Sequence, residues 1–204
     1  MIAIIDYGVG NIRAFANIYK KLDVPLKIAK RAEDLENVEK LILPGVGAFD
    51  HAISQLEASG MRQTLDHLVL ERGLPVIGIC VGMQMLAKSS DEGKLPGLGW
   101  IDASVKKFDE SKIRFKTHLP HMGWNDIALV KENKLLAGLE KNAKFYFLHS
   151  YYFDCNANND VIATSDYGIE FSCAVNKGNI YGVQFHPEKS HEFGIQLLKN
   201  FSEL

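Results

Sequence analysis

The sequence has few cysteines, no long apolar run and almost no excess of charge. Its 204 residues include three cysteines, Cys80, Cys155 and Cys173, which are too few for a disulfide framework and lack the paired CxxC spacing of a zinc site. Cys155 stands in a polar stretch read as a turn and Cys173 in an apolar run read as a strand, so both are predicted to be structural. No window approaches the roughly 20 apolar residues of a membrane span, and the start has no positively charged leader. We therefore expect a cytoplasmic protein that does not enter a membrane.

The charge balance also argues against nucleic acid as a partner. Lys and Arg total 23 against 25 Asp and Glu, which gives a net charge of -2, and no basic run is long enough to bind nucleic acid. Hydrophobic residues make up 47% and charged residues 24%, as in globular proteins. No linker rich in Pro, Gly or Ser divides the chain and no internal repeat is visible, so we predict a single domain over residues 1–204.

The first half alternates short apolar runs with amphipathic stretches. Runs of Ile, Val and Leu that are buried on both faces are typical of parallel strands with helices between them. We predict strands over residues 2–7, 26–29, 40–43 and 75–80. We predict helices over residues 12–22, 50–56, 63–70 and 83–88.

The second half has strand-like segments with few helices between them, which favours antiparallel pairing. These strands are predicted over residues 100–108, 143–153, 161–165, 171–175 and 180–185, before a closing helix over residues 191–201. The predicted fold is an α/β, doubly wound mixed sheet. It is parallel in the N-terminal half, carries an antiparallel C-terminal extension and has helices on both faces.

One cysteine stands at a strand-to-helix turn flanked by glycines, in Gly78-Ile79-Cys80-Val81-Gly82. Such a nucleophile elbow forces its central residue into a strained backbone conformation, and glycines two residues to either side relieve the crowding. The macrodipole and free N–H groups of the following helix favour a thiolate. The backbone N–H of Val81 is placed to bind a developing oxyanion. Cys80 is therefore the candidate nucleophile.

A histidine and a glutamate stand two residues apart near the end of the chain. Residues i and i+2 of an extended segment point to the same side, and Pro187 keeps the backbone out of a helix, so His186 and Glu188 should project together. An imidazole beside a thiolate stabilises it and protonates the leaving amine, while a carboxylate behind the imidazole fixes its tautomer. The pattern predicts a catalytic triad of Cys80, His186 and Glu188.

The other histidines offer weaker candidates. His121, in a loop-like segment, and His149 are rival bases, but neither has a carboxylate two residues further on. The remaining four are expected to be exposed or to lie on helix faces: His51, His67, His118 and His191. No two histidines have the i, i+4 spacing of a helical metal site, so no metal is implied.

Several ordered motifs resemble those of class I, triad-type glutamine amidotransferases. They are residues 5–11 (IDYGVGN), 44–49 (PGVGAF), 78–84 (GICVGMQ), 119–125 (LPHMGWN) and 186–190 (HPEKS). The resemblance covers nearly the whole chain and is strongest to the glutaminase subunits of imidazole glycerol phosphate synthases. It implies that Cys80 attacks the side-chain amide of L-glutamine, forms a glutamyl thioester and releases ammonia, after which water releases glutamate. No cofactor is implied.

The resemblance also assigns roles around the nucleophile. The second oxyanion donor, beside Val81, is the peptide at Val46, which must flip to point inward, and the glycines around it make that rotation reasonable. Four further residues match substrate-binding positions: Gly47, Gln84, Ser150 and Tyr151.

Ammonia needs an acceptor, and nothing in the sequence offers a second site for a phosphate, nucleotide or sugar. The resemblance implies a heterodimer with a separate (β/α)8-barrel synthase subunit that receives ammonia through an internal tunnel. Four residues match interface positions of the family: Asn11, Trp124, Tyr146 and Lys189. We expect partner binding to flip residues 44–47, because an unregulated glutaminase wastes glutamine.

Other interpretations stay open at this point. A paralogous glutaminase that supplies ammonia for sugar amination in surface-polysaccharide synthesis keeps the same chemistry, and residues 149–153 and 189–194 are somewhat similar to such paralogues. A cysteine peptidase or thioesterase on a related scaffold would not need Gln84 or the motif at residues 44–47. A non-catalytic binding subunit would not need the triad.

Overall fold

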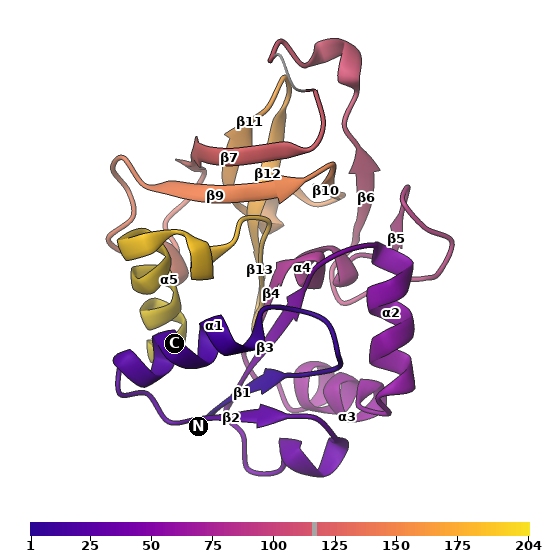
Figure 1. Ribbon diagram of the computed structural model, residues 1–204, viewed down its shortest axis with the longest axis vertical. Coiled ribbons are helices and arrows are strands. Elements are labelled where there is room, and N and C mark those ends of the chain that lie inside the picture. Colours follow the sequence, from indigo (N-terminus) through magenta and orange to yellow (C-terminus); the bar gives the residue numbers. More distant parts are fainter. Residues whose placement is uncertain (116–117) are drawn as a thin grey trace.

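The protein is described by a computed structural model that covers residues 1–115 and 118–204 (Figure 1). Its centre is a mixed sheet with the strand order β2-β1-β3-β4-β13-β12-β10-β6-β5. The parallel strands are β1 (Ile2–Ile5), β2 (Leu26–Ala29), β3 (Lys40–Gly45), β4 (Val76–Cys80) and β13 (Ile180–Val183). The parallel half thus ends on a strand from the C-terminal part of the chain.

The antiparallel extension begins where β12 pairs with β13. Its strands are β6 (Ala103–Lys107), β8 (Ala128–Leu129), β10 (Tyr151–Cys155), β11 (Val161–Asp166) and β12 (Glu170–Lys177), with the short β5 (Ser89–Ser90) parallel to β6 at the edge. The predicted mixed fold is confirmed.

Helices cover both faces of the parallel half (Figure 1). They are α1 (Ile12–Lys21), α2 (Phe49–Ala58), α3 (Arg62–Asp66), α4 (Val81–Met85) and α5 (His191–Glu203). A π-helical turn at His67–Glu71 extends α3. Short 3-10 turns lie at Ala32–Leu35, Glu110–Lys112, Lys134–Leu136, Asn158–Asp160 and Pro187–Lys189. Helices α1 and α5 lie on one face, joined by a 3.0 Å hydrogen bond from the buried Tyr19 hydroxyl to the Leu198 carbonyl.

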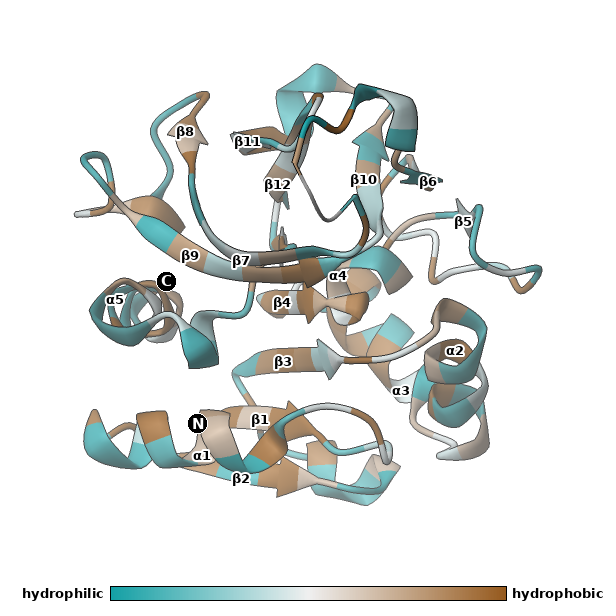
Figure 2. Cartoon of the chain, turned by 45° about the horizontal axis from the view of Figure 1, so that its top comes forward, coloured by the Kyte–Doolittle hydropathy of each residue, from teal (hydrophilic) through white to brown (hydrophobic). Residues whose placement is uncertain are grey.

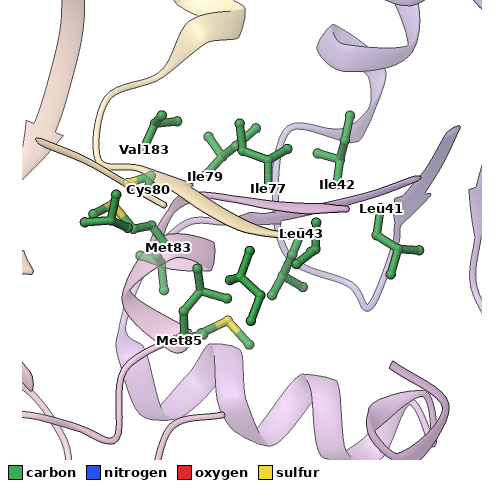
Figure 3. Packing of buried hydrophobic residues seen from close by; sticks show 14 of the residues in the cluster. Leu41, Ile42, Leu43, Ile77, Ile79, Cys80, Met83, Met85 and Val183 are labelled. Carbon is green, nitrogen blue, oxygen red and sulfur yellow. The ribbon is translucent and has the colours of Figure 1, made fainter. Parts of the chain in front are cut away.

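The central strands are apolar on both faces because both faces are covered. Figure 2 shows β1, β3 and β4 in the brown of hydrophobic residues. In Figure 3, Ile42, Ile77 and Val183 point to one side of the strands, while Leu43 points to the other side, where Met85 of α4 lies. All five side chains are buried. This two-sided core fixes the carboxyl ends of β3 and β4, where the site lies.

Three details of the second half differ from the prediction. Residues 143–153 do not form one strand, because the chain changes sheets at Ser150 between β9 (Lys144–His149) and β10. Strand β9 pairs with β7 (His121–Asp126) in a separate two-stranded antiparallel sheet, so His121 lies in a strand rather than a loop. Cys155 ends β10 instead of lying in a turn, whereas Cys173 is in a strand, as predicted.

Within the residues described, no helix combines the length and apolar character needed to span a membrane.

Candidate active site

Cys80 ends β4 and directly precedes α4, and its backbone is strained. Its φ of 55° and ψ of -113° lie in a region that residues with a side chain rarely adopt. The flanking glycines are required by space: a Cβ on Gly78 would lie 2.6 Å from the Gly82 carbonyl oxygen, and one on Gly82 would lie 1.9 Å from the Leu43 carbonyl oxygen. The strand, turn and helix can approach this closely only without those side chains, which leaves Cys80 at the apex of the elbow.

His186 and Glu188 form a buried pair. Nδ1 of His186 lies 2.9 Å from Oε1 of Glu188, and the two side chains are only 4% and 1% exposed. Glu188 reaches the imidazole from the 3-10 turn Pro187–Lys189 rather than from an extended segment as predicted. Burial lowers the pKa of His186, but hydrogen bonds and negative charge from Cys80 and Glu188 outweigh it and raise the pKa to about 10. The imidazole is therefore charged at neutral pH.

The three predicted catalytic side chains thus come together, although Cys80 is far from His186 and Glu188 in the sequence. Cys80 and His186 line the same cavity, and the Cys80 sulfur is close enough to raise the pKa of His186. Glu188 occupies Nδ1, which leaves Nε2 as the nitrogen available to the sulfur. A thiolate next to an imidazolium is the ground state that cysteine nucleophiles use. Strands β4 and β13 lie in register, with Val183 opposite Ile79, which brings the segment after β13 alongside Cys80.

Strand β9 crosses the site, and its backbone carbonyl groups lie close to both His186 and Cys80. The backbone N–H of His186 donates to the Tyr146 carbonyl at 2.8 Å, and the Cys80 Sγ lies 3.9 Å from the Leu148 carbonyl. The amide of the fully buried Gln184 lies 3.9 Å from the same sulfur. Sequence reasoning missed Leu148 and Gln184. Only the second left a signal, because it precedes His186 by two residues in an extended run.

A cavity of about 350 Å³ opens in front of Cys80. It is lined by all of the residues predicted to form the oxyanion hole and to bind substrate: Val46, Val81, Gly47, Gln84, Ser150 and Tyr151. Lys189, predicted at the interface, also lines it. Four lining residues were not predicted to bind substrate: Glu92, Pro120, Leu148 and His149, the last considered only as a rival base. A volume of this size suits a small metabolite.

Hydrogen bonds to groups in and around the cavity wall fix two of its polar side chains, Gln84 and Glu92. The Gln84 amide nitrogen donates to the Gln184 side-chain oxygen at 3.1 Å and to the Tyr151 carbonyl at 3.3 Å. The Glu92 carboxylate accepts from the backbone N–H of Phe49, the first residue of α2, at 2.9 Å. The cavity therefore offers a fixed amide and a fixed carboxylate.

The rival bases are a separate pair. His121 and His149 are hydrogen-bonded to each other, and burial lowers their pKa values to about 4 and about 3. Both are neutral at physiological pH, and among the residues that the structure describes neither forms a hydrogen bond with a carboxylate. The other histidines are exposed as expected: His51, His67, His118 and His191.

Three of the predicted interface residues form a cluster, Trp124, Tyr146 and Lys189, and Lys189 also lines the cavity. Trp124 is 47% exposed, stacks on His191 at 5.2 Å and meets Tyr146 edge-on at 6.3 Å. The Lys189 ammonium lies over the Tyr146 ring at 5.6 Å. Asn11 is exposed just before α1, and that helix packs against the Pro187–Lys189 turn.

Across residues 1–115 and 118–204, no group of three or more His, Cys, Asp or Glu side chains is arranged to hold a metal ion.

A mixed α/β sheet with a strained cysteine at a strand-to-helix turn, beside a buried His–Glu pair, defines an enzyme that works through a covalent thioester. The family model "Glutamine amidotransferase class-I" matches residues 3–203. The chain belongs to the class I glutamine amidotransferase family and is a glutaminase. This membership decides against the peptidase, thioesterase and non-catalytic interpretations.

Relatives and solved structures agree with this family. The chain is 57% identical to the imidazole glycerol phosphate synthase subunit HisH of Bdellovibrio bacteriovorus and 52% identical to that of Leptospira interrogans, with 100% of each chain covered. A crystal structure of a glutamine amidotransferase matches with a TM-score of 0.76 at 21% identity, covering 100% of this chain and 99% of the other. The structure of PurLQS from Thermotoga maritima matches with a TM-score of 0.73 at 17% identity, covering 98% of this chain and 96% of the other.

Proposed function

We propose that the protein is the glutaminase subunit of an imidazole glycerol phosphate synthase, which hydrolyses L-glutamine and passes ammonia to a separate (β/α)8-barrel synthase subunit in histidine biosynthesis. The full-length identity of 57% to a HisH subunit supports the assignment of the pathway. The placement of Cys80 and the buried His186–Glu188 pair at one cavity carries the chemistry.

The reaction proceeds in two halves on Cys80. The thiolate attacks the side-chain amide carbon of glutamine, the C–S bond forms, and the C–N bond breaks as His186 gives its proton to the leaving nitrogen, which departs as ammonia. Water then attacks the thioester with its proton passing to His186, and the C–S bond breaks to release glutamate. Glu188 holds the imidazole orientation in both halves because its bond to Nδ1 leaves Nε2 toward the sulfur.

The oxyanion of each tetrahedral intermediate is bound by the N–H groups of Val81 and Val46, the second after a peptide flip. The packing before Val46 limits which peptides can rotate. The Tyr7 hydroxyl donates to the Pro44 carbonyl at 2.6 Å, and Gly45 packs so closely that a Cβ on it would lie 2.4 Å from the Gly82 nitrogen. Beyond Gly45 the chain is open, because Val46 is exposed and the strand has ended. Rotation is therefore confined to the peptides after Gly45.

The cavity wall suggests how the amino-acid end of glutamine is held. Gly47, Gln84, Ser150 and Tyr151 are the proposed substrate contacts, and the Glu92 carboxylate adds a negative charge suited to the α-ammonium group. Lys189 lines the same cavity and offers a positive charge near the mouth.

The partner is proposed to dock over the cavity mouth, through Trp124, Tyr146, Lys189 and Asn11. Apolar side chains exposed there support this: Met122 is 62% exposed and Trp124 47%. Docking is proposed to flip the Val46 peptide, so that glutamine is hydrolysed when an acceptor site is present. An isolated chain that hydrolyses glutamine as fast as the complex would contradict this coupling.

A second acceptor is a candidate because some relatives are named as numbered copies of the subunit. Relatives in Pseudomonas aeruginosa, at 46% identity over 100% of both chains, and in Methanococcus maripaludis, at 46% identity over 98% of both, carry the name subunit HisH 2, a numbered copy. Two copies of one subunit can serve two acceptors, and the second candidate acceptor is a sugar-amination enzyme of surface-polysaccharide synthesis. Co-purification separates the two: a barrel cyclase supports the first proposal and a sugar-amination enzyme the second.

The deciding experiment for the glutaminase subunit uses Cys80→Ala in complex with the barrel partner. We expect loss of glutamine-dependent synthesis with ammonia-dependent synthesis intact, because only the ammonia source is removed. Loss of both together would mean that Cys80 is structural, and retention of both would mean that another group hydrolyses glutamine.

A further inference from the structure

Two buried histidines behind the cavity are not used by the proposed chemistry. His121 on β7 and His149 at the end of β9 are 4% and 6% exposed, and His149 lines the cavity while His121 does not. Nδ1 of His121 lies 2.9 Å from Nε2 of His149. Buried polar side chains in direct contact require a defined pattern of donors and acceptors, so their hydrogen-bond partners decide which nitrogens carry protons.

The positions of the protons follow from the two ends of this chain of hydrogen bonds, because backbone groups fix the direction of the bond at each end. Nδ1 of His149 lies 2.8 Å from the Tyr151 carbonyl, which only accepts, so this nitrogen carries a hydrogen. The Asn125 side-chain oxygen accepts from the N–H of Asp126 at 2.9 Å, and its nitrogen donates to the Asp166 carbonyl at 2.8 Å. The Asn125 nitrogen is therefore a donor toward Nε2 of His121, 3.2 Å away.

Every bond between these ends then has one direction. Asn125 donates to Nε2 of His121, Nδ1–H of His121 donates to Nε2 of His149, and Nδ1–H of His149 donates to the Tyr151 carbonyl. Both rings are neutral and both carry their hydrogen on Nδ1. Aromatic rings enclose the pair, with Tyr167 stacked 4.1 Å from His121 and Phe108 edge-on 5.4 Å from His149, which favours the uncharged forms.

The relay ends on a carbonyl that the substrate cavity also uses. The Tyr151 carbonyl accepts from Gln84, whose amide bonds Gln184, and Tyr151 itself lines the cavity. Positive charge on His186 lowers the pKa of His149, so a proton on His149 would in turn oppose the imidazolium that pairs with Cys80. The lone pair of His149 that could take such a proton is already occupied by His121.

We propose that Asn125, His121 and His149 are positioning residues of the glutaminase site, which act through a one-directional relay of neutral imidazoles. The relay fixes the Tyr151 carbonyl, and with it the cavity wall at residues 148–151, against the β7–β9 sheet. It joins the two sheets where the chain crosses between them at Ser150. This proposal rests on the glutaminase function proposed above, because the wall it fixes is the proposed glutamine-binding wall.

The first test is the imidazole nitrogen NMR spectrum of the full wild-type chain at pH 7, assigned with single histidine variants. We expect both His121 and His149 to carry hydrogen on Nδ1 alone, with no change between pH 6 and pH 9. A hydrogen on Nε2 of either ring, or a titration of either ring in that range, would overturn the relay. This measurement needs neither substrate nor partner.

The second test compares His121→Leu with His121→Asn in the complex with the barrel partner. Asparagine keeps a donor nitrogen near the position of Nδ1 and can still donate to His149, whereas leucine has no hydrogen-bonding group. We expect His121→Leu to raise the KM for glutamine roughly tenfold with little change in kcat, because it leaves buried hydrogen-bonding groups of His149 and Asn125 without their partner. We expect His121→Asn to keep a KM within about threefold of wild type.

The outcomes separate the two proposals. An unchanged KM in His121→Leu, or an equal change in the leucine and asparagine variants, would overturn the positioning role while leaving the glutaminase assignment intact. A wild-type complex that fails to hydrolyse glutamine would contradict the proposed function, and the tautomers seen by NMR would be unaffected. His67→Leu is the matched control, because His67 is an exposed histidine outside the cluster.

Discussion

Replacing Glu188 with glutamine removes a buried negative charge from beside His186 while keeping the shape of the side chain. The two groups are 2.9 Å apart, and the glutamine oxygen can still accept the Nδ1 hydrogen bond. What changes is the charge that favours the imidazolium. We therefore expect the pKa of His186 to fall in Glu188→Gln, because an opposite charge at this range moves a pKa by roughly 1 to 3.

The largest possible fall in the pKa of His186 follows from its value in the wild-type protein. The pKa of His186 is raised from 6.5 to about 10, with Cys80 and Glu188 both contributing against burial. That difference corresponds to roughly 5 kcal/mol of preferential interaction with the charged ring. Part of it remains in Glu188→Gln, because the Cys80 sulfur is untouched.

The assay is an NMR titration of the His186 imidazole in both proteins, with His186→Gln to identify the signal. Stability gives an independent check. Between pH 6.5 and about 10 the native state holds a proton that the unfolded state has released, so the free energy of unfolding falls as pH rises through that window. The total fall should be larger in wild type than in Glu188→Gln, because the window extends to a higher pH when the native pKa of His186 is higher. A His186 that titrates near 6.5 in wild type, or identically in both proteins, would refute this reasoning.

Three further substitutions test the elbow, the strand beside it and the interface. Gly82→Ala places a Cβ 1.9 Å from the Leu43 carbonyl oxygen, so denaturant unfolding should reveal a loss of about 3 kcal/mol or more, with loss of glutaminase activity. Tyr7→Phe leaves the buried Pro44 carbonyl without its 2.6 Å partner and should cost about 1 to 3 kcal/mol of stability in the same assay. Trp124→Ala removes a ring that is 47% exposed, so calorimetry should detect roughly tenfold or greater weakening of partner binding with stability nearly unchanged.

Each of these has a control or a contrary result. Gly60→Ala is the control for the elbow, because among the described residues beyond its chain neighbours no atom lies within 4 Å of its Cβ position, although its φ of +71° carries a cost of about 1 kcal/mol. A loss in Gly82→Ala no larger than in Gly60→Ala would mean that the close approach is not required. Unchanged stability in Tyr7→Phe would mean that water replaces the hydroxyl. Unchanged partner affinity in Trp124→Ala would place the interface elsewhere.

Features encoded by neighbouring residues could be predicted from the sequence. The apolar run at Ile2–Ile5 is buried on both faces, and the glycines around Cys80 stand where a Cβ would collide with backbone. The His186–Glu188 contact was predicted from an i, i+2 spacing in an extended chain, but a 3-10 turn makes it. The pair of residue types was informative although the assumed backbone was not.

Features that depend on distant pairing could not be predicted. Nothing near Ser150 marks a change of sheet, because residues 143–153 are apolar enough to read as one strand. Strand β7 contains Gly123 at a φ of +132°, and its register with β9 is what brings His121 opposite His149, 28 residues away. Glu92 reaches the cavity through its bond to the backbone of Phe49, a contact with no local pattern.

The most direct test of the central claim is covalent capture of the nucleophile by an electrophilic glutamine analogue, followed by mass mapping of the modified peptide. The predicted result is one adduct per chain, on Cys80 and not on Cys155 or Cys173, prevented by excess glutamine and greatly slowed in His186→Gln. A folded protein that forms no adduct, or that is labelled at another cysteine, would contradict the assignment of Cys80 as the group that cleaves glutamine.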